Sequence, residues 1–349
     1  MKRSIQLLFI LFAFFPFQSI FAQTIDETVN NLSQQAGAAY VQPVVSAFSS
    51  NLNSAWFDTA PSTSILGFDL SVKVSASASF FNNDQKRFNS SGSFRFTGSQ
   101  VDDILANSGI TSSSTGYQSI KNDMLSQEFT VDFSGPTIVG SDQENMVIKF
   151  NGANIQGQNI AATSINVTGV KGLLNNYSAL PFGSIQFGLG TVYGTKALIR
   201  WFPSVTVQDL GKITFFGWGF MHNASSWFNN SLPVDISLGF FSQKLTVGDV
   251  FESNATQYGI YLSKTFGMGV SFSPFVGLTN ETGTTTVKYN YTFDTPAGAT
   301  TQHLQFDLDG ANSTAFTLGA NFKLFILNLS VDYKLAKTNT ASASVFFGF

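Results

Sequence analysis

The stretch Gly67–Phe80, GFDLSVKVSASASF, alternates between two kinds of residue over its whole length. Every second residue, starting at Phe68, is apolar, and the residues between are small or polar, including the charged Asp69 and Lys73. Successive side chains of a strand point to opposite faces, so the pattern predicts a strand with one apolar and one polar face. It is more than twice as long as the ~5–6 residues of an average strand in a soluble protein.

The same alternation recurs along the rest of the chain, which predicts an all-β fold. The further candidate strands lie at 92–98, 127–134, 145–150, 184–192, 195–202, 212–221, 234–240, 257–265, 268–278, 287–293, 304–309, 314–323, 327–335 and 341–349. Single-chain bacterial barrels have an even number of strands, so these segments predict about 14 strands, within a range of roughly 12–16. Residues 98–126 and 151–182 are rich in Ser, Thr, Asn and Gly and are predicted to be long loops. Residues 67–349 are therefore expected to form one domain.

Alternation is shared by soluble β-sandwiches and by transmembrane β-barrels, which turn the apolar face inward and outward respectively. Charged residues make up 11% of the chain, against about 25% in soluble domains. The polar faces are mostly Gly, Ser and Thr, whereas a water-exposed face would carry more Lys and Glu. The strand lengths also suit a tilted membrane crossing of ~9–11 residues. These features favour a transmembrane antiparallel β-barrel whose outward face contacts lipid.

The first 66 residues have a different pattern. Residues 1–22 begin with two basic residues, continue with an apolar run and end at Ala22, which predicts a cleaved secretory signal peptide. A membrane anchor helix is the alternative, but Pro16 and the short apolar run argue against it. In residues 23–66, apolar side chains recur at spacings of three and four, which predicts one or two helices ahead of the barrel. Pro43 is expected in the first turn of the second helix.

Composition excludes several classes of function. The chain has no cysteine, which rules out disulfide bonds, thiolate catalysis and cysteine metal sites. The net charge is −3 and there is no long basic run, so nothing indicates nucleic-acid binding. We expect no cofactor.

The carboxyl end, ASASVFFGF, again alternates, and its apolar positions include Val345, Phe347 and Phe349. In a closed barrel the last strand pairs with the first, so its terminal ring would lie at the membrane interface. The segment resembles the carboxy-terminal signature of bacterial outer-membrane proteins. That resemblance implies an assembly signal, recognised by the barrel-assembly machinery, and a location in the cell outer membrane.

Longer stretches extend the resemblance over most of the chain after the signal peptide. GFDLSVKVSASASFF, LPFGSIQFGLGTVYGTKALIRWFP and GKITFFGWGFMHNASSWFNNSLPVDISLGFF are similar to a family of uncharacterised outer-membrane barrel proteins of Gram-negative bacteria. More distantly, helices before a barrel resemble the long-chain fatty acid transporters, whose amino-terminal segment plugs the lumen. The shared motifs are strands and turns, so the resemblance implies a location rather than an activity.

Candidate catalytic and metal-binding residues are few. His222 and His303 are the two histidines, and neither has the spacing of a metal ligand. His222 lies near Ser225 and Ser226, but no third group completes a hydrolase triad, so a turn residue is the better interpretation. We expect neither enzyme activity nor a metal site.

The charged residues of the polar faces are the main candidates for a functional site. By alternation they face the lumen, since a lysine at mid-depth on the lipid face would cost about 2–4 kcal/mol. They are Asp69, Lys73, Lys196, Arg200, Asp235, Lys323, Asp332 and Lys334. Paired charges could fill a closed lumen, or they could line a path for solute. The leading hypothesis is a passive channel or transporter for small solutes, hydrophobic ones included, with the helices occluding the lumen. The alternative is a closed structural or adhesive barrel that acts through its surface loops.

Overall fold

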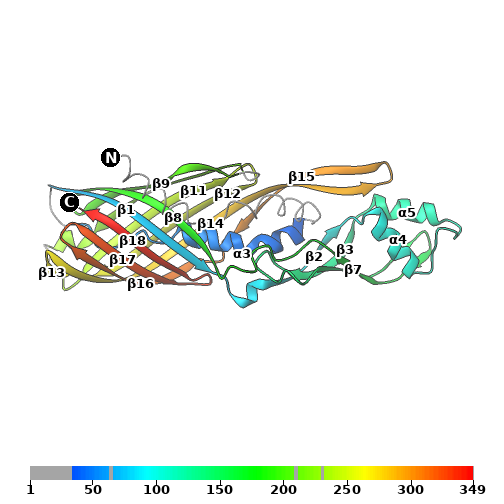
Figure 1. The fold of residues 1–349 in the computed structure, drawn as a ribbon, viewed down its shortest axis with the longest axis horizontal. Helices are drawn as coiled ribbons and strands as arrows, with labels where there is room; N and C mark the ends of the chain where they lie inside the picture. The colour runs from blue at the N-terminus through cyan, green and yellow to red at the C-terminus, as the bar shows by residue number, and fades with distance from the viewer. Residues whose placement is uncertain (1–33, 63–65, 208–210, 229–231, 349) are drawn as a thin grey trace.

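The computed structural model describes residues 34–62, 66–207, 211–228 and 232–348. Within them, ten antiparallel strands pair edge to edge into a closed barrel (Figure 1). In the order of the ring, they are β1 (Leu66–Phe80), β8 (Ala179–Val192), β9 (Thr195–Val207), β10 (Gly211–Asn223), β11 (Asp235–Val247), β12 (Phe251–Ser263), β14 (Val270–Thr295), β16 (Thr314–Leu324), β17 (Leu327–Leu335) and β18 (Thr340–Gly348). The first and last strands pair from Ser71 opposite Gly348 to Ser79 opposite Thr340. The expectation of an all-β antiparallel barrel is confirmed.

The expected count of about 14 strands, and the range of roughly 12–16, is too high. Segments 92–98, 127–134 and 145–150 overlap or fall in strands of a separate sheet. Segments 268–278 and 287–293 are two parts of the single long strand β14. Segment 304–309 belongs to β15 (Gly298–Asp309), which pairs with β14 outside the ring, as does β13 (Phe266–Met268). Alternation indicates that one face of a strand is buried, but it does not indicate in which sheet the strand lies. The predicted count of barrel strands therefore includes strands of the second sheet.

The connection between β1 and β8 is a folded unit, residues 81–178, here called the insertion domain. Its main sheet has the order β2 (Arg87–Phe94), β3 (Phe129–Pro136), β4 (Met146–Phe150) and β7 (Thr163–Val167). The hairpin of β5 (Ala153–Ile155) and β6 (Gln158–Ile160), the 3₁₀ turn η1 (Asn83–Lys86) and two helices complete it. The prediction of long loops is therefore wrong: residues 98–126 form α4 (Gly98–Asn107) and α5 (Tyr117–Ser126), and 151–182 contains strands.

The barrel has two unlike ends. At the end where β18 finishes, two connections are tight turns at Tyr193–Gly194 and Phe325–Ile326, and a third contains the 3₁₀ helix η2 (Ala224–Phe228). We call this the turn end. The insertion domain and the long β14–β15 hairpin extend from the opposite end (Figure 1), here called the insertion end.

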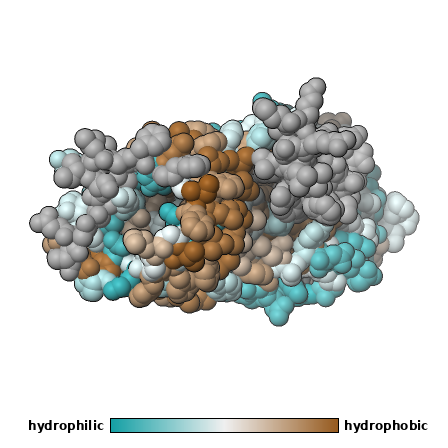
Figure 2. Space-filling view, turned by 60° about the vertical axis from the view of Figure 1, so that its left-hand side comes forward, coloured by the Kyte–Doolittle hydropathy of each residue, from teal (hydrophilic) through white to brown (hydrophobic). Residues whose placement is uncertain are grey.

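The outward face of the barrel wall is apolar toward the turn end. Its exposed large side chains include Phe187, Ile199, Phe216, Trp218, Phe240, Tyr258, Ile260, Phe272, Leu278, Phe316, Leu318, Leu329, Val331, Val345 and Phe347. In Figure 2 the hydrophobic residues, in brown, form a band with hydrophilic surface, in teal, on both sides. Exposure of apolar side chains on this scale exceeds what an ordinary soluble surface carries.

The helix α3 (Gln34–Leu52) lies ahead of the first strand and confirms the expectation of an amino-terminal helix. It runs from the insertion domain into the barrel (Figure 1). Pro43 is inside this single helix of 19 residues, not in the first turn of a second one. Within the described residues, no helix is both long and apolar enough to cross a membrane. The predicted signal peptide, residues 1–22, lies outside the described residues.

Candidate functional site: the plugged lumen

The lumen of the barrel is filled by residues 48–58, here called the plug, which comprise the last turn of α3 and the turn that follows it. Gly283 of β14 and Gly310, in the connection between β15 and β16, leave room for the plug to approach closely. An added Cβ on Gly283 would lie 1.9 Å from Ser49 Oγ, and one on Gly310 would lie 2.3 Å from the same atom. The small residues at these positions therefore admit the helix into the lumen.

Three cations of the barrel wall bind backbone carbonyls of the plug, one in the last turn of α3 and the others in the turn that follows it. Lys334 Nζ donates to Ser50 O at 2.8 Å, and Lys73 Nζ donates to Ala55 O at 2.7 Å. The two terminal nitrogens of Arg200 donate to Ser54 O at 2.8 Å and to Ala55 O at 2.6 Å. The end of a helix carries a partial negative charge on its unpaired carbonyls. Since α3 has no basic residue in its last turn, the wall supplies the positive charge.

Carboxylates accompany the cations. Lys334 Nζ lies 3.1 Å from Glu281 Oε2, and these side chains are 2% and 0% exposed. Lys73 Nζ lies 2.7 Å from Asp58 Oδ2, a carboxylate of the plug itself. Because burying an unpaired charge is costly, each wall lysine that reaches the plug is matched by an acid.

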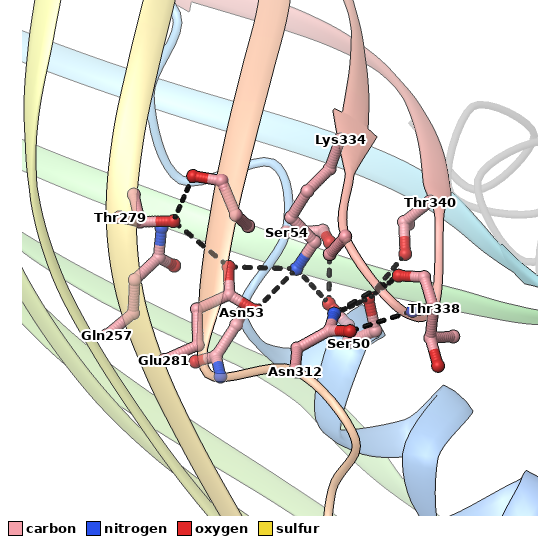
Figure 3. Close-up of polar contacts among 12 residues, drawn as sticks. Ser50, Asn53, Ser54, Gln257, Thr279, Glu281, Asn312, Lys334, Thr338 and Thr340 are labelled. Carbon is pink, nitrogen blue, oxygen red and sulfur yellow. Dashed lines mark hydrogen bonds and ion pairs between the residues drawn. The ribbon is translucent and has the colours of Figure 1, made fainter.

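Neutral polar groups make the rest of the contact (Figure 3). Asn53 accepts from Gln243 Nε2 at 2.6 Å and donates to Thr282 O at 3.2 Å. The Ser50 and Thr340 hydroxyls lie 2.7 Å apart, and Asn312 Nδ2 donates to Ser50 Oγ at 3.0 Å. The plug is thus bonded to wall strands that are far apart in sequence, which fixes its position in the ring.

Two aromatic residues of the plug pack against the wall below the helix end. Trp56 stacks on Phe241 with ring centroids 4.6 Å apart, and the Arg200 guanidinium lies 3.7 Å from the Trp56 ring. Phe57 stacks on Tyr261 at 4.4 Å and meets an edge of Phe275 at 5.1 Å. Such pairs contribute roughly 0.5–1.5 kcal/mol each beyond their buried area.

Little space remains beside the plug. The cavity between the plug and the wall has a volume of about 10 Å³, and Gln257, Tyr261, Asp332 and Lys334 are among its lining residues. A volume of this size accommodates about one water molecule. This cavity therefore has no room for a solute larger than water.

All eight charged candidates lie on inward-facing positions of their strands, but they form two groups. Lys73, Arg200 and Lys334 contact the plug, and Asp332 lines the cavity beside it. The others lie apart from these contacts. Lys196 pairs with Asp69 at 2.9 Å, Asp235 accepts from Asn223 Nδ2 at 3.1 Å, and Lys323 is half-buried opposite Asn328 in the register.

Sequence reasoning missed Glu281, Asp58, Trp56 and Tyr261. Glu281 lies between two predicted strands that the structure joins into β14, so its inward position was not recognised. Counting on in steps of two from inward positions such as Ser273 would have found it. Asp58 and Trp56 lie inside the segment 23–66 that is predicted to be helical, but they follow the last residue of α3, so the helical spacing does not indicate their direction.

Val345, Phe347 and the two histidines lie away from the contacts between the plug and the wall. Val345 and Phe347 are exposed on the outward face, Phe349 lies outside the described residues, and their role as an assembly signal stays a prediction. The Thr195 hydroxyl lies 2.9 Å from His222 Nδ1, and the His222 ring lies against Trp227 at the turn end. His303 is on β15, beside Asn290. Among the described residues, no cluster of three potential metal ligands occurs.

Comparison with solved structures finds other barrels at low similarity. OmpT of Vibrio cholerae, an outer membrane protein in its trimer form, is 8% identical, and the match covers 82% of this chain and 100% of that one at a TM-score of 0.22. The beta domain of the Bordetella autotransporter BrkA is 8% identical, with 81% and 100% covered and a TM-score of 0.22. The transport unit of the autotransporter AIDA-I from Escherichia coli is 9% identical, with 88% and 99% covered and a TM-score of 0.22. At these scores the likeness carries no argument about this chain.

Comparison by sequence gives one result. Among curated proteins, nothing matches the chain. A protein-family model, described as a family of unknown function (DUF6588), matches residues 1–349. The resemblance to long-chain fatty acid transporters stays a prediction.

Proposed function

The chain belongs to the family of unknown function DUF6588, and we propose that it is an outer-membrane β-barrel closed by its own amino-terminal segment. In this proposal the barrel anchors the insertion domain at the outer surface of the membrane, and the protein acts through that domain. The observation that carries the proposal is the plug. Wall cations, carboxylates and amides bind it directly, and the cavity left beside it is about 10 Å³.

Membrane insertion is supported by the closed ring and by the apolar band. A closed barrel satisfies its backbone hydrogen bonds internally, which the interior of a bilayer requires. The outward side chains toward the turn end are large and apolar (Figure 2). Transmembrane barrels of bacteria have short periplasmic turns and long external loops. By that rule the turn end faces the periplasm and the insertion domain lies outside.

A channel that opens when the plug moves is the second candidate. It is favoured by the polar character of the contact between the plug and the wall. Replacing a buried ion pair with apolar residues often leaves stability unchanged or raises it, so a permanently closed lumen has no need of Lys334 and Glu281. Polar surfaces can be hydrated after they separate, which suits a plug that leaves and returns.

Planar-bilayer conductance distinguishes the two candidates. The full-length protein is expected to show no steady conductance, and a steady open level would contradict the closed barrel. The variant Lys73→Met with Arg200→Met removes three hydrogen bonds to the carbonyls of Ser54 and Ala55. If the barrel is an anchor, this variant stays silent; if it is a gated channel, it shows intermittent openings.

Thiol labelling tests the location and orientation, because the chain has no cysteine of its own. Ser112→Cys introduces a thiol at an exposed position of the insertion domain, and Met268→Cys introduces one at the turn end. An impermeant maleimide should label the first in intact cells and the second only after the outer membrane is permeabilised. Labelling in the reverse order would refute the proposed orientation.

A further inference from the structure

The helix α3 belongs to two cores at once. Its first half is part of the hydrophobic core of the insertion domain, where Ala36 and Tyr40 are each 0% exposed. Phe88 of β2 lies in the same core, and β2 packs directly against α3. Its second half ends in the plug, bound by Lys334 and Arg200. A single helix therefore completes the packing of the insertion domain and closes the lumen.

The insertion domain also bonds to the helix by hydrogen bonds. Pro43 has no amide hydrogen, so the helical ladder is interrupted next to Tyr40. The amide of Ile138 donates to Tyr40 O at 3.1 Å, and the Tyr40 hydroxyl donates to Lys171 O at 2.7 Å. Ile138 lies just after β3, and Lys171 lies just after β7. The part of α3 next to Pro43 is thus held by the domain at two points.

The β14–β15 hairpin makes a third attachment to the same part of the helix. Gln42 Nε2 donates to Asp309 O at 2.8 Å. Val287 of β14 and Phe306 of β15 are buried in the core that contains α3 and the insertion domain. The hairpin therefore links the helix to the barrel wall from outside the lumen.

We propose that α3 is a strap that couples the insertion domain to the plug, so that displacing the domain from outside loosens the plug. Separating α3 from its partners costs free energy at both ends. At one end it exposes buried apolar residues, and at the other it exposes buried charges. Coupling between two sites is reciprocal in free energy, so loosening the plug must also loosen the domain. That the displacement acts from outside the cell rests on the proposed function and its orientation. The coupling between the insertion domain and the plug does not.

The test uses a lumen thiol as reporter in the full-length, detergent-folded protein. Ser54→Cys places a thiol in the plug, at a side chain that is 3% exposed, and its reaction rate with a small thiol reagent measures how often the plug opens. Phe88→Ala weakens the contact between β2 and α3. It is expected to raise the labelling rate by roughly 5-fold or more, the range of ordinary coupling.

The matched control is Ile120→Ala, in α5 of the same domain. Ile120 is also buried, at 3% exposed against 8% for Phe88, and α5 packs mainly against α4, with smaller contacts to β14 and β5, so this variant should change the rate much less than Phe88→Ala. Tyr40→Phe, which removes the bond to Lys171 O and keeps the ring, gives a milder second perturbation should Phe88→Ala fail to fold. Heat-modifiable mobility reports whether the barrel is intact in each case.

The reciprocal measurement is hydrogen exchange in β2 and β3 after Lys334→Met. Faster exchange there, together with faster Ser54→Cys labelling in Phe88→Ala, supports the strap. An insertion domain that loosens while the lumen thiol stays protected would overturn it. Because this assay involves neither a bilayer nor intact cells, its outcome is independent of the conductance and orientation tests.

Discussion

At the scale of single residues, Lys334 illustrates how the closed lumen depends on paired charges. Its ammonium bonds both Glu281 and the helix carbonyl of Ser50, and all of these groups are buried (Figure 3). Removing one partner of such a pair leaves the other charged and desolvated. The consequence should be much larger than for a pair on the surface.

The variant Lys334→Met is expected to lower the free energy of unfolding by about 3–5 kcal/mol, because Glu281 is left unpaired. The double variant Lys334→Met with Glu281→Leu should recover most of that loss. Lys244→Met is the control, since Lys244 and Glu252 form a pair with 53% and 39% exposed side chains, worth about 0–1 kcal/mol. Denaturant unfolding in detergent measures all three, and equal losses for Lys334→Met and Lys244→Met would contradict the argument.

Gly283→Ala should wedge the wall against the helix, because the new Cβ would lie 1.9 Å from Ser49 Oγ. Overpacking of this kind typically costs about 1–3 kcal/mol. The double variant with Ser49→Gly should recover stability by removing the obstructing hydroxymethyl group. Gly348→Ala is the matched control, since its nearest neighbour, Asn328 Nδ2, is 3.7 Å away. The heat-modification midpoint on a gel reports the effect, and no difference between the two glycines would refute it.

The sequence predicts these contacts only in part. Alternation indicates the inward direction of Lys73, Arg200 and Lys334 in strands with clear polar faces. It does not indicate that their partners are backbone carbonyls of the plug. Ser50 and Lys334, for example, are 284 residues apart. Contacts between distant segments depend on the closure of the ring, and no local pattern encodes that closure.

At the scale of elements, the insertion domain shows where composition misled the prediction. Residues 98–126 look like a loop because Ser, Thr, Asn and Gly dominate. A helix signal is nevertheless present, since the Thr97 hydroxyl accepts from the amide of Gln100 and the Gln100 side chain accepts from the amide of Thr97. This capping box, followed by Val101, Ile104 and Leu105 at helical spacing, identifies the start of α4.

The contact between α4 and α5 should weaken in acid. Lys121 and the Tyr117 hydroxyl both bond Asp102, and these bonds hold the pKa of that carboxyl below its usual range. A carboxyl whose pKa is lowered on folding stabilises the fold above its unfolded pKa and loses that contribution as the pH falls through the folded pKa.

Hydrogen exchange in α4 and α5 should therefore speed up as the pH falls below about 4, once the intrinsic pH dependence is subtracted. Asp102 is 44% exposed, so the effect should not exceed about 1 kcal/mol. Asp102→Asn should abolish this acid-dependent part, and Asp103→Asn, at the neighbouring position, should keep it. A pH response that persists in Asp102→Asn would assign it to another group.

At the scale of the whole molecule, the direction of α3 has a consequence for topology. The helix begins in the core of the insertion domain, its other end lies in the lumen, and β1 starts at the turn end. Periodicity predicts the helix but not this direction, because an amphipathic pattern is the same whichever mouth of the barrel the helix enters. The choice is made by its packing against β2 and the β14–β15 hairpin.

A thiol at the start of α3 should therefore be accessible from outside. Gln34→Cys lies at an exposed position and is expected to react with an impermeant maleimide in intact cells at a rate similar to Ser112→Cys. Met268→Cys serves as the protected reference. If Gln34→Cys reacts only after permeabilisation while Ser112→Cys reacts before it, the helix enters from the other mouth.

The barrel wall surrounds a segment of its own chain, because the plug precedes the first wall strand in sequence and lies inside the ring. The first half of α3 is fixed in the insertion domain. The element that follows the plug in sequence is β1, the first strand of the barrel. If the seam between β1 and β18 sealed first, the amino-terminal end would have to be pushed through a passage lined with unpaired charges. If the seam seals last, the wall closes around a helix that is already seated. From the direction of one helix we therefore expect the plug to be in place before the seam between β1 and β18 closes.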